Sequence, residues 1–190
     1  MKTDVITVDN KGDSLQLALN RIEGLANSVT KSDKNGHYLR LMAEELFGIV
    51  SANAGDFTAK FWAENQNRDF RIVLEADAKE LPDEAKKDLL SISSTGENSE
   101  DSGIMDKIGS LFCFFAKGGN AANVKTFDCG YNESSGDISW SLKDYKSTIK
   151  NKNLDASLEE LSKSVIANIV DDIKVGVKDK KVKIEIFKTF

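Results

Sequence analysis

Apolar residues in the first half of the chain recur at a helical period in two segments and then at a period of two. Between residues 14 and 30, and again over 37–53, apolar side chains return every three or four positions, which predicts two amphipathic helices. Over 57–63 and 70–76 every second residue is apolar, and the polar stretch ENQNRD lies between them. This pattern predicts a β-hairpin that packs on the two helices.

The rest of the chain also alternates between helical and strand patterns. Residues 93–103, by contrast, carry no large apolar side chain, and we expect an exposed loop there. The other predicted elements are a strand at 4–8, a helix that starts at Pro82, a helix at 103–115, an edge strand at 124–129, a strand at 138–142, a helix at 156–171, and a closing hairpin with strands at 173–177 and 182–186.

These elements predict helices on one face of a largely antiparallel sheet. The expected fold class is therefore α+β, a two-layer sandwich with a mostly antiparallel mixed sheet. The chain has 190 residues, enough to bury a core of its own, and we predict a single domain over 1–190. Residues 1–115 are its expected core, and residues 116–190 add a strand, a helix and a hairpin to the same domain.

The composition excludes several classes of function. A net charge of -5 argues against a dedicated binder of nucleic acid or of an anionic membrane surface. No apolar run approaches the roughly 20 residues that span a bilayer, and the first residues hold no apolar signal core. Cys113 and Cys129 lack the spacing of a metal or redox pair, so a reduced, cytoplasmic protein is expected. His37 is the single histidine, which excludes most histidine-based metal and triad chemistry.

Glu45 is the candidate functional side chain of the second predicted helix. It shares a helical face with Leu41, Gly48 and Ala52, and this strip of mostly small residues could form the floor of a pocket. If Glu45 were buried without a partner, its charge would be costly. It therefore meets a ligand or a partner side chain, or it reaches solvent. The ordinary alternative to a ligand is a carboxylate at the edge of the apolar stripe that pairs with a lysine or arginine.

The segment LRLMAEELFGIV resembles a helix of the histidine-kinase-like ATPase fold, known as the GHKL or Bergerat group. The predicted order of helix, hairpin, helix, loop and helix along the chain is also similar to that fold. The similarity is greatest to the anti-sigma-factor kinase type. GENSEDSGIMDKIGSLF is similar to the lid loop and following helix of those domains, and the segment from 158 to 190 looks like the C-terminal part of a group of clostridial ATP-binding proteins.

The resemblance implies that ATP binds with magnesium. Glu45 would then be the catalytic, base-like carboxylate next to the metal, and Asp77 would face the adenine. The backbone of Gly96, Gly103 and Ile104 would meet the phosphates, at a helix start that suits an anion.

The chain departs from the family's pattern at the residues that hold the nucleotide. An asparagine that binds magnesium follows the glutamate by four residues in the family, whereas here Ile49 follows Glu45 and Gly48 follows Glu44. Asp77 is present, but the two glycines that should follow it are missing, so the backbone cannot easily turn against a base. A degenerate nucleotide site is expected, with no protein-bound metal and no tightly bound cofactor.

Two functions stay open. The favoured hypothesis is a non-catalytic or weakly nucleotide-binding regulatory protein that keeps the ATPase scaffold and acts through a protein partner. The C-terminal helix and hairpin, taken as an addition to a minimal kinase-type domain, favour it. The alternative is an active ATP- and magnesium-binding serine/threonine kinase of the anti-sigma type. Neither nucleic acid nor a membrane is expected as a partner, and a homodimer stays open.

Overall fold

The computed structural model describes residues 1–9, 12–54, 57–77, 130–132, 137–151, 164–178 and 181–190. The strands in these residues form one sheet in the order β1-β2-β3-β7-β6-β5-β4. Every pairing between them is antiparallel. The strands are β1 (Ile6–Asp9), β2 (Thr58–Gln66), β3 (Asp69–Asp77), β4 (Gly130–Asn132), β5 (Asp137–Ser141), β6 (Asp172–Lys178) and β7 (Lys181–Thr189).

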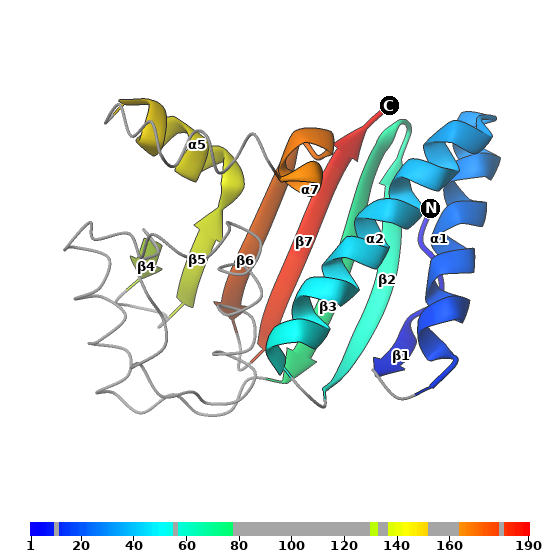
Figure 1. Ribbon diagram of the computed structural model, residues 1–190, viewed down its shortest axis with the longest axis horizontal. Coiled ribbons are helices and arrows are strands. Elements are labelled where there is room, and N and C mark those ends of the chain that lie inside the picture. The colour runs from blue at the N-terminus through cyan, green and yellow to red at the C-terminus, as the bar shows by residue number, and fades with distance from the viewer. Residues whose placement is uncertain (10–11, 55–56, 78–129, 133–136, 152–163, 179–180) are drawn as a thin grey trace.

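The helices of the described residues are α1 (Ser14–Thr30), α2 (Asp33–Ala54), α5 (Leu142–Asn151) and α7 (Val165–Ile169). Figure 1 shows α1, α2 and α7 in front of the same face of the sheet. The expected two-layer α+β class is therefore confirmed. The expected mixed character of the sheet is not found, because the described strands contain no parallel pair.

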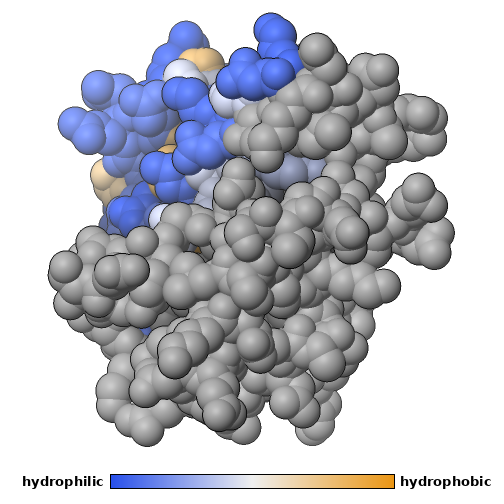
Figure 2. All heavy atoms as spheres, turned by 90° about the vertical axis from the view of Figure 1, so that its left-hand side faces the viewer, coloured by the Kyte–Doolittle hydropathy of each residue, from blue (hydrophilic) through white to orange (hydrophobic). Residues whose placement is uncertain are grey.

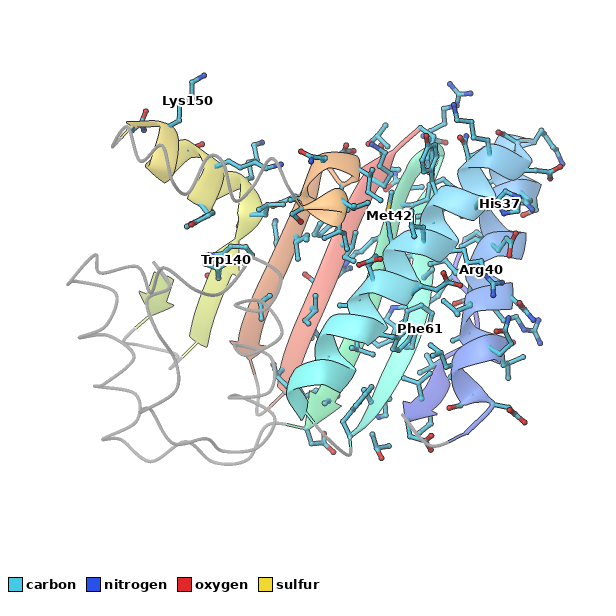
Figure 3. The ribbon with its side chains drawn as sticks, in the orientation of Figure 1. His37, Arg40, Met42, Phe61, Trp140 and Lys150 are labelled. Carbon is cyan, nitrogen blue, oxygen red and sulfur yellow. The ribbon has the colours of Figure 1, made fainter. Side chains whose placement is uncertain are left out.

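The hydrophobic core lies between this face of the sheet and the helices. Alternate residues of β2, β3, β6 and β7 point into it, as a period of two requires. Burying one such side chain contributes about 1.5–3 kcal/mol. The largest fully buried side chains are Phe61, Phe70, Ile22, Leu39, Met42, Leu46, Ile72 and Leu74. Figure 3 shows Met42 of α2 and Phe61 of β2 in the space between the helix and the sheet.

Two residues with positive φ end elements where the sequence predicts turns. Lys31 (φ 56°) closes α1, and its backbone N–H donates to Asn27 O at 3.0 Å. Asn67 (φ 57°) lies in the turn between β2 and β3, where asparagine tolerates the left-handed region better than most residues. The register that follows this turn pairs Gln66 with Asp69 and Phe61 with Leu74. The hairpin predicted from the alternating pattern is confirmed.

The second predicted hairpin is also confirmed, and it lies in the middle of the sheet rather than at an edge. β7 pairs with β3 from Asp69–Thr189 to Asp77–Lys181, and with β6 on its other side. The C-terminal hairpin is therefore an integral part of the central sheet.

Several predicted boundaries are wrong. α2 begins at Asp33, not at 37, because Ser32 O accepts the backbone N–H of Asn35 and Gly36 and opens the helix earlier. Of the helix predicted at 156–171, the described part is α7, and Val170 is already extended. α5 was not among the predicted elements. The helices predicted after Pro82 and at 103–115, the loop at 93–103 and the strand at 124–129 lie outside the described residues.

None of the described helices is long and apolar enough to cross a membrane. The described surface that is visible in Figure 2 is mostly hydrophilic.

Candidate functional site

Glu45 lies on the solvent side of α2. The buried stripe of this helix runs through Leu39, Met42 and Leu46, and Glu45 is exposed. Within the described part of the chain, no group forms a hydrogen bond or ion pair with the carboxylate of Glu45. It therefore bears no burial penalty, and the lysine or arginine partner considered from the sequence is not found among the described residues.

Asp77, the residue expected to face adenine, is the last residue of β3 and is exposed. Its register partner on β7 is Lys181. Figure 1 shows that α2 and β3 end at the same lower edge of the molecule, so the fold brings the elements that carry Glu45 and Asp77 toward one edge. The other expected contacts, at Gly96, Gly103 and Ile104, lie outside the described residues.

The described residues do not match the family's pattern for holding magnesium, a glutamate followed four residues later by an asparagine. After Glu45 the next turn of α2 presents Gly48 and Ile49, neither of which has a side-chain oxygen that could bind a hard cation. Across the described ranges, no group of three or more His, Cys, Asp and Glu side chains could hold a metal ion.

A polar network joins α1 to α2 one turn before Glu45. Arg40 Nε donates to Glu44 Oε1 at 2.9 Å, the pair that the spacing of four residues predicts. Arg40 also reaches α1, where it donates to Glu23 Oε2 at 3.0 Å, and His37 Nδ1 lies 2.8 Å from Glu23 Oε1. Figure 3 shows His37 and Arg40 on the side of α2 that is near α1. The hydrogen bond from Arg40 is the main cause that lowers the pKa of Glu23.

Sequence reasoning missed this contact between the helices. The spacing along α2 predicts the pair of Arg40 with Glu44, but no local signal relates Arg40 to Glu23. Only the packing of α1 against α2 brings them together.

A second charged cluster lies on the face of the sheet opposite the helices, which we call the open face. Lys181 Nζ and Lys183 Nζ lie 2.9 and 3.0 Å from the two carboxylate oxygens of Glu75. Glu75 is the one charged residue that is buried within the described part of the chain. Burial would raise the pKa of Glu75, but the hydrogen bonds from the two lysines outweigh it and hold the pKa below its ordinary value.

Trp62 lies beside this cluster. Its Nε1 donates to Glu64 Oε1 at 2.8 Å, and the ammonium groups of Lys2 and Lys183 lie 4.7 and 5.9 Å from the centre of its ring. These are cation–π distances. The hydrogen bond from Trp62 is the main cause that lowers the pKa of Glu64. Trp62 therefore belongs to the open face and not to the core between sheet and helices.

The open face continues into a shallow hollow at the turn between β2 and β3. The hollow has a volume of about 580 Å³, and its lining includes Lys2, Glu64, Asp69, Arg71 and Phe187. Arg71 donates to Glu64 Oε2 at 3.3 Å and to Glu185. Both charged and aromatic groups are therefore available to a molecule in this hollow.

Comparison of the chain with family models, with curated proteins and with solved structures finds no match.

Proposed function

We propose that this chain is a non-catalytic regulatory protein on a histidine-kinase-like ATPase scaffold, and that it acts by binding a protein partner. The observation that carries the proposal is the absence of a metal-binding side chain on α2, one turn after Glu45, where a kinase would hold magnesium. Glu45 is exposed there, and Gly48 and Ile49 follow it in place of an amide side chain. Phosphoryl transfer depends on positioning and on neutralising charge, and both require that metal.

The arrangement of elements supports the scaffold part of the proposal. Two helices precede the hairpin of β2 and β3, and all helices of the described residues except α5 lie in front of one face of the sheet in Figure 1. Of the order on which the resemblance rests, the described residues show the helix and the hairpin that follows it, and the later elements lie outside those residues. The resemblance itself comes from the sequence.

The alternative function is an ATP- and magnesium-dependent serine/threonine kinase of the anti-sigma type. One observation favours it: α2 and β3, which carry Glu45 and Asp77, end at the same edge of the molecule (Figure 1). A nucleotide that bridges the two elements would lie at that edge.

Titration calorimetry with ATP and magnesium separates the two functions. We expect no detectable binding or a dissociation constant in the millimolar range, about -4 kcal/mol. Glu45→Ala and Asp77→Ala should then leave the titration unchanged. Lys34→Ala, exposed at the opposite end of α2, is the control for a substitution far from that edge. A micromolar constant that Glu45→Ala or Asp77→Ala abolishes would overturn the proposal and favour the kinase.

A further inference from the structure

The open face of the sheet carries many of the charged side chains of the described strands. Its side chains alternate along the strands with the core residues and so lie on the face away from the core. The helices α1, α2 and α7 lie on the other face, that of the core (Figure 1). α5 also packs on the helix side, because Tyr145 contacts the Trp140 ring and Lys146 Nζ donates to Ala167 O of α7. No described helix covers the open face.

The cations of the open face are more exposed than its carboxylates. The side chains of Lys2, Lys181, Arg71 and Lys183 are 51, 43, 39 and 37% exposed, whereas those of Glu64, Glu185 and Glu75 are 32, 18 and 9% exposed. The carboxylates are closer to the strands, and the cationic groups are closer to solvent. An approaching molecule therefore meets positive charge first.

Two further lysines add to this charge. Lys60 on β2 and Lys174 on β6 are exposed, and no described carboxylate lies within ion-pair distance of either. Lys174 Nζ lies 5.0 Å from the centre of the Phe187 ring. With them, six cations and three glutamates lie on this face, and we call this group the basic centre, in a protein whose net charge is -5.

The aspartates of this face are confined to the ends of strands. Asp9 ends β1, Asp69 and Asp77 begin and end β3, and Asp172 begins β6. Aspartates thus lie at ends of β1, β3 and β6, although Lys181 begins β7 beside Asp77, its register partner. A long, uniform polyanion would also pass over these aspartates, so the distribution favours a short anionic segment.

We propose that the open face binds an acidic, extended segment of a partner protein. The inference rests on the proposed function and adds the chemistry of the partner. The basic centre spans β2, β3, β7 and β6, a width of about 15 Å at the usual spacing of strands, which about five extended residues cover. The hollow at the turn between β2 and β3 then accepts an apolar side chain next to the acidic stretch.

Nucleic acid fits the same face less well. Single-stranded nucleic acid gains affinity by stacking its bases on aromatic rings. Trp62 is 8% exposed, with Lys2 and Lys183 over its ring, and Lys174 covers the ring of Phe187. Neither ring offers a free platform for a base.

Fluorescence anisotropy tests the proposal with a labelled peptide of five glutamates followed by phenylalanine. We expect binding at low salt that weakens as salt is added. The double variant Lys60→Gln/Lys174→Gln should weaken it about fivefold, since each exposed charge contributes modestly. These lysines hold no carboxylate, so their loss leaves no buried charge unpaired. Thermal unfolding checks that the variant folds.

The matched control is Lys34→Gln/Lys150→Gln, which removes the same charge from α2 and α5. Figure 3 shows Lys150 at the end of α5, pointing away from the rest of the molecule. Its affinity for the peptide should equal that of the unchanged chain. No binding at low salt would overturn the proposal, and so would an equal loss in both double variants.

A labelled oligouridylate is the second probe. Tighter binding of this probe than of the peptide would overturn the choice of a protein segment. The failures of the two proposals are also distinguishable. Peptide binding together with micromolar ATP binding sustains the basic face and overturns the non-catalytic function, whereas a chain that binds neither overturns only the basic face.

Discussion

Lys183 Nζ lies 3.0 Å from Glu75 Oε2, and the two residues are direct register partners on β7 and β3. Lys181, two residues earlier on the same strand, holds the other carboxylate oxygen at 2.9 Å. One buried carboxylate is thus shared by two ammonium groups that reach solvent. The two lysines stabilise the fold through Glu75 only while its carboxylate is charged. Burial makes that charge unfavourable, and the attraction to the lysines offsets this cost.

The first prediction is that Glu75 makes the stability of the protein depend on pH. Its pKa is lowered in the folded state, and in the unfolded chain it is about 4.3. The contribution of Glu75 to the free energy of unfolding is therefore complete above the unfolded pKa and is lost as pH falls through the folded pKa. Urea unfolding at pH 7 and at pH 3 measures it.

Glu75→Gln should lower the free energy of unfolding by about 1–3 kcal/mol at pH 7, since the two lysines lose a charged partner. The difference from the unchanged chain should shrink at pH 3. Glu45→Gln is the matched control, because Glu45 is exposed, and it should leave both values unchanged. A Glu75→Gln effect of the same size at both pH values would contradict the assignment.

The second prediction concerns the contact between the start of α2 and the end of α1. A Cβ added to Gly36 would lie 1.9 Å from Asn27 Oδ1, far inside van der Waals contact. Asn27 Oδ1 is itself buried without a hydrogen-bond partner among the described residues. Gly36→Ala should therefore lower the free energy of unfolding by about 1–2 kcal/mol, as overpacking does.

The same substitution should reverse its sign when Asn27 is shortened. In the background of Asn27→Ala the clash is gone, and alanine should stabilise the helix by about 0.5–1 kcal/mol relative to glycine. Gly24→Ala on α1 is the control, because a Cβ there meets no atom within 4 Å. A double-mutant cycle by urea unfolding measures the coupling, and additive effects would show that Asn27 moves aside without resistance.

The third prediction concerns Glu23, which Arg40 and His37 approach from α2. The hydrogen bond from Arg40 is the largest cause that lowers the pKa of Glu23, and His37 contributes less. Arg40→Gln should therefore raise the pKa of Glu23 toward its ordinary value, and His37→Asn should raise it by a smaller amount. Carboxyl ¹³C NMR titration measures both. A larger rise in His37→Asn would mean that His37, and not Arg40, is the main partner in solution.

The parts of the fold that sequence could predict are those whose signal is local. The alternation of Phe70, Ile72 and Leu74 is visible in sequence, and these residues line the core as predicted. The pairing of β7 with β3 joins residues more than a hundred positions apart, and no pattern within either strand specifies it. Glu45 and Asp77 were candidates from the sequence. That α2 and β3, which carry them, end at one edge could not be predicted, because this too depends on contacts between distant segments.

α5 shows how a non-local contact can hide a helix. Its sequence, LKDYKSTIKN, is mostly polar, and the strand pattern of ISWSL runs directly into it. One local signal was available: Ser141 is followed three residues later by Asp144, a pattern typical of a helix start. The stronger support comes from β6, where Asp172 Oδ1 accepts the backbone N–H of Lys143 at 3.0 Å and the hydroxyl of Ser141 at 3.1 Å.

The last prediction is that Asp172 fixes the start of α5. Asp172→Ala should leave the N–H of Lys143 without its acceptor and should destabilise the helix start by about 0.5–2 kcal/mol, as the loss of a capping side chain does. Hydrogen exchange at the backbone amides of α5 should become faster by the corresponding factor. Amides of β3 should keep their exchange rates, because β3 makes no contact with Asp172 and is held by β2 and β7.

Asp172→Asn separates the geometry of this contact from its charge. Asparagine keeps the Oδ1 atom that accepts from Lys143 and Ser141, so the amides of α5 should retain most of their protection. If Asp172→Asn exchanged as fast as Asp172→Ala, the negative charge near the first turn of α5 would be the stabilising feature instead, through its attraction to the helix dipole. Unchanged exchange in both variants would show that Ser141 alone is sufficient to start the helix, since its hydroxyl accepts the N–H of Asp144 at 3.3 Å.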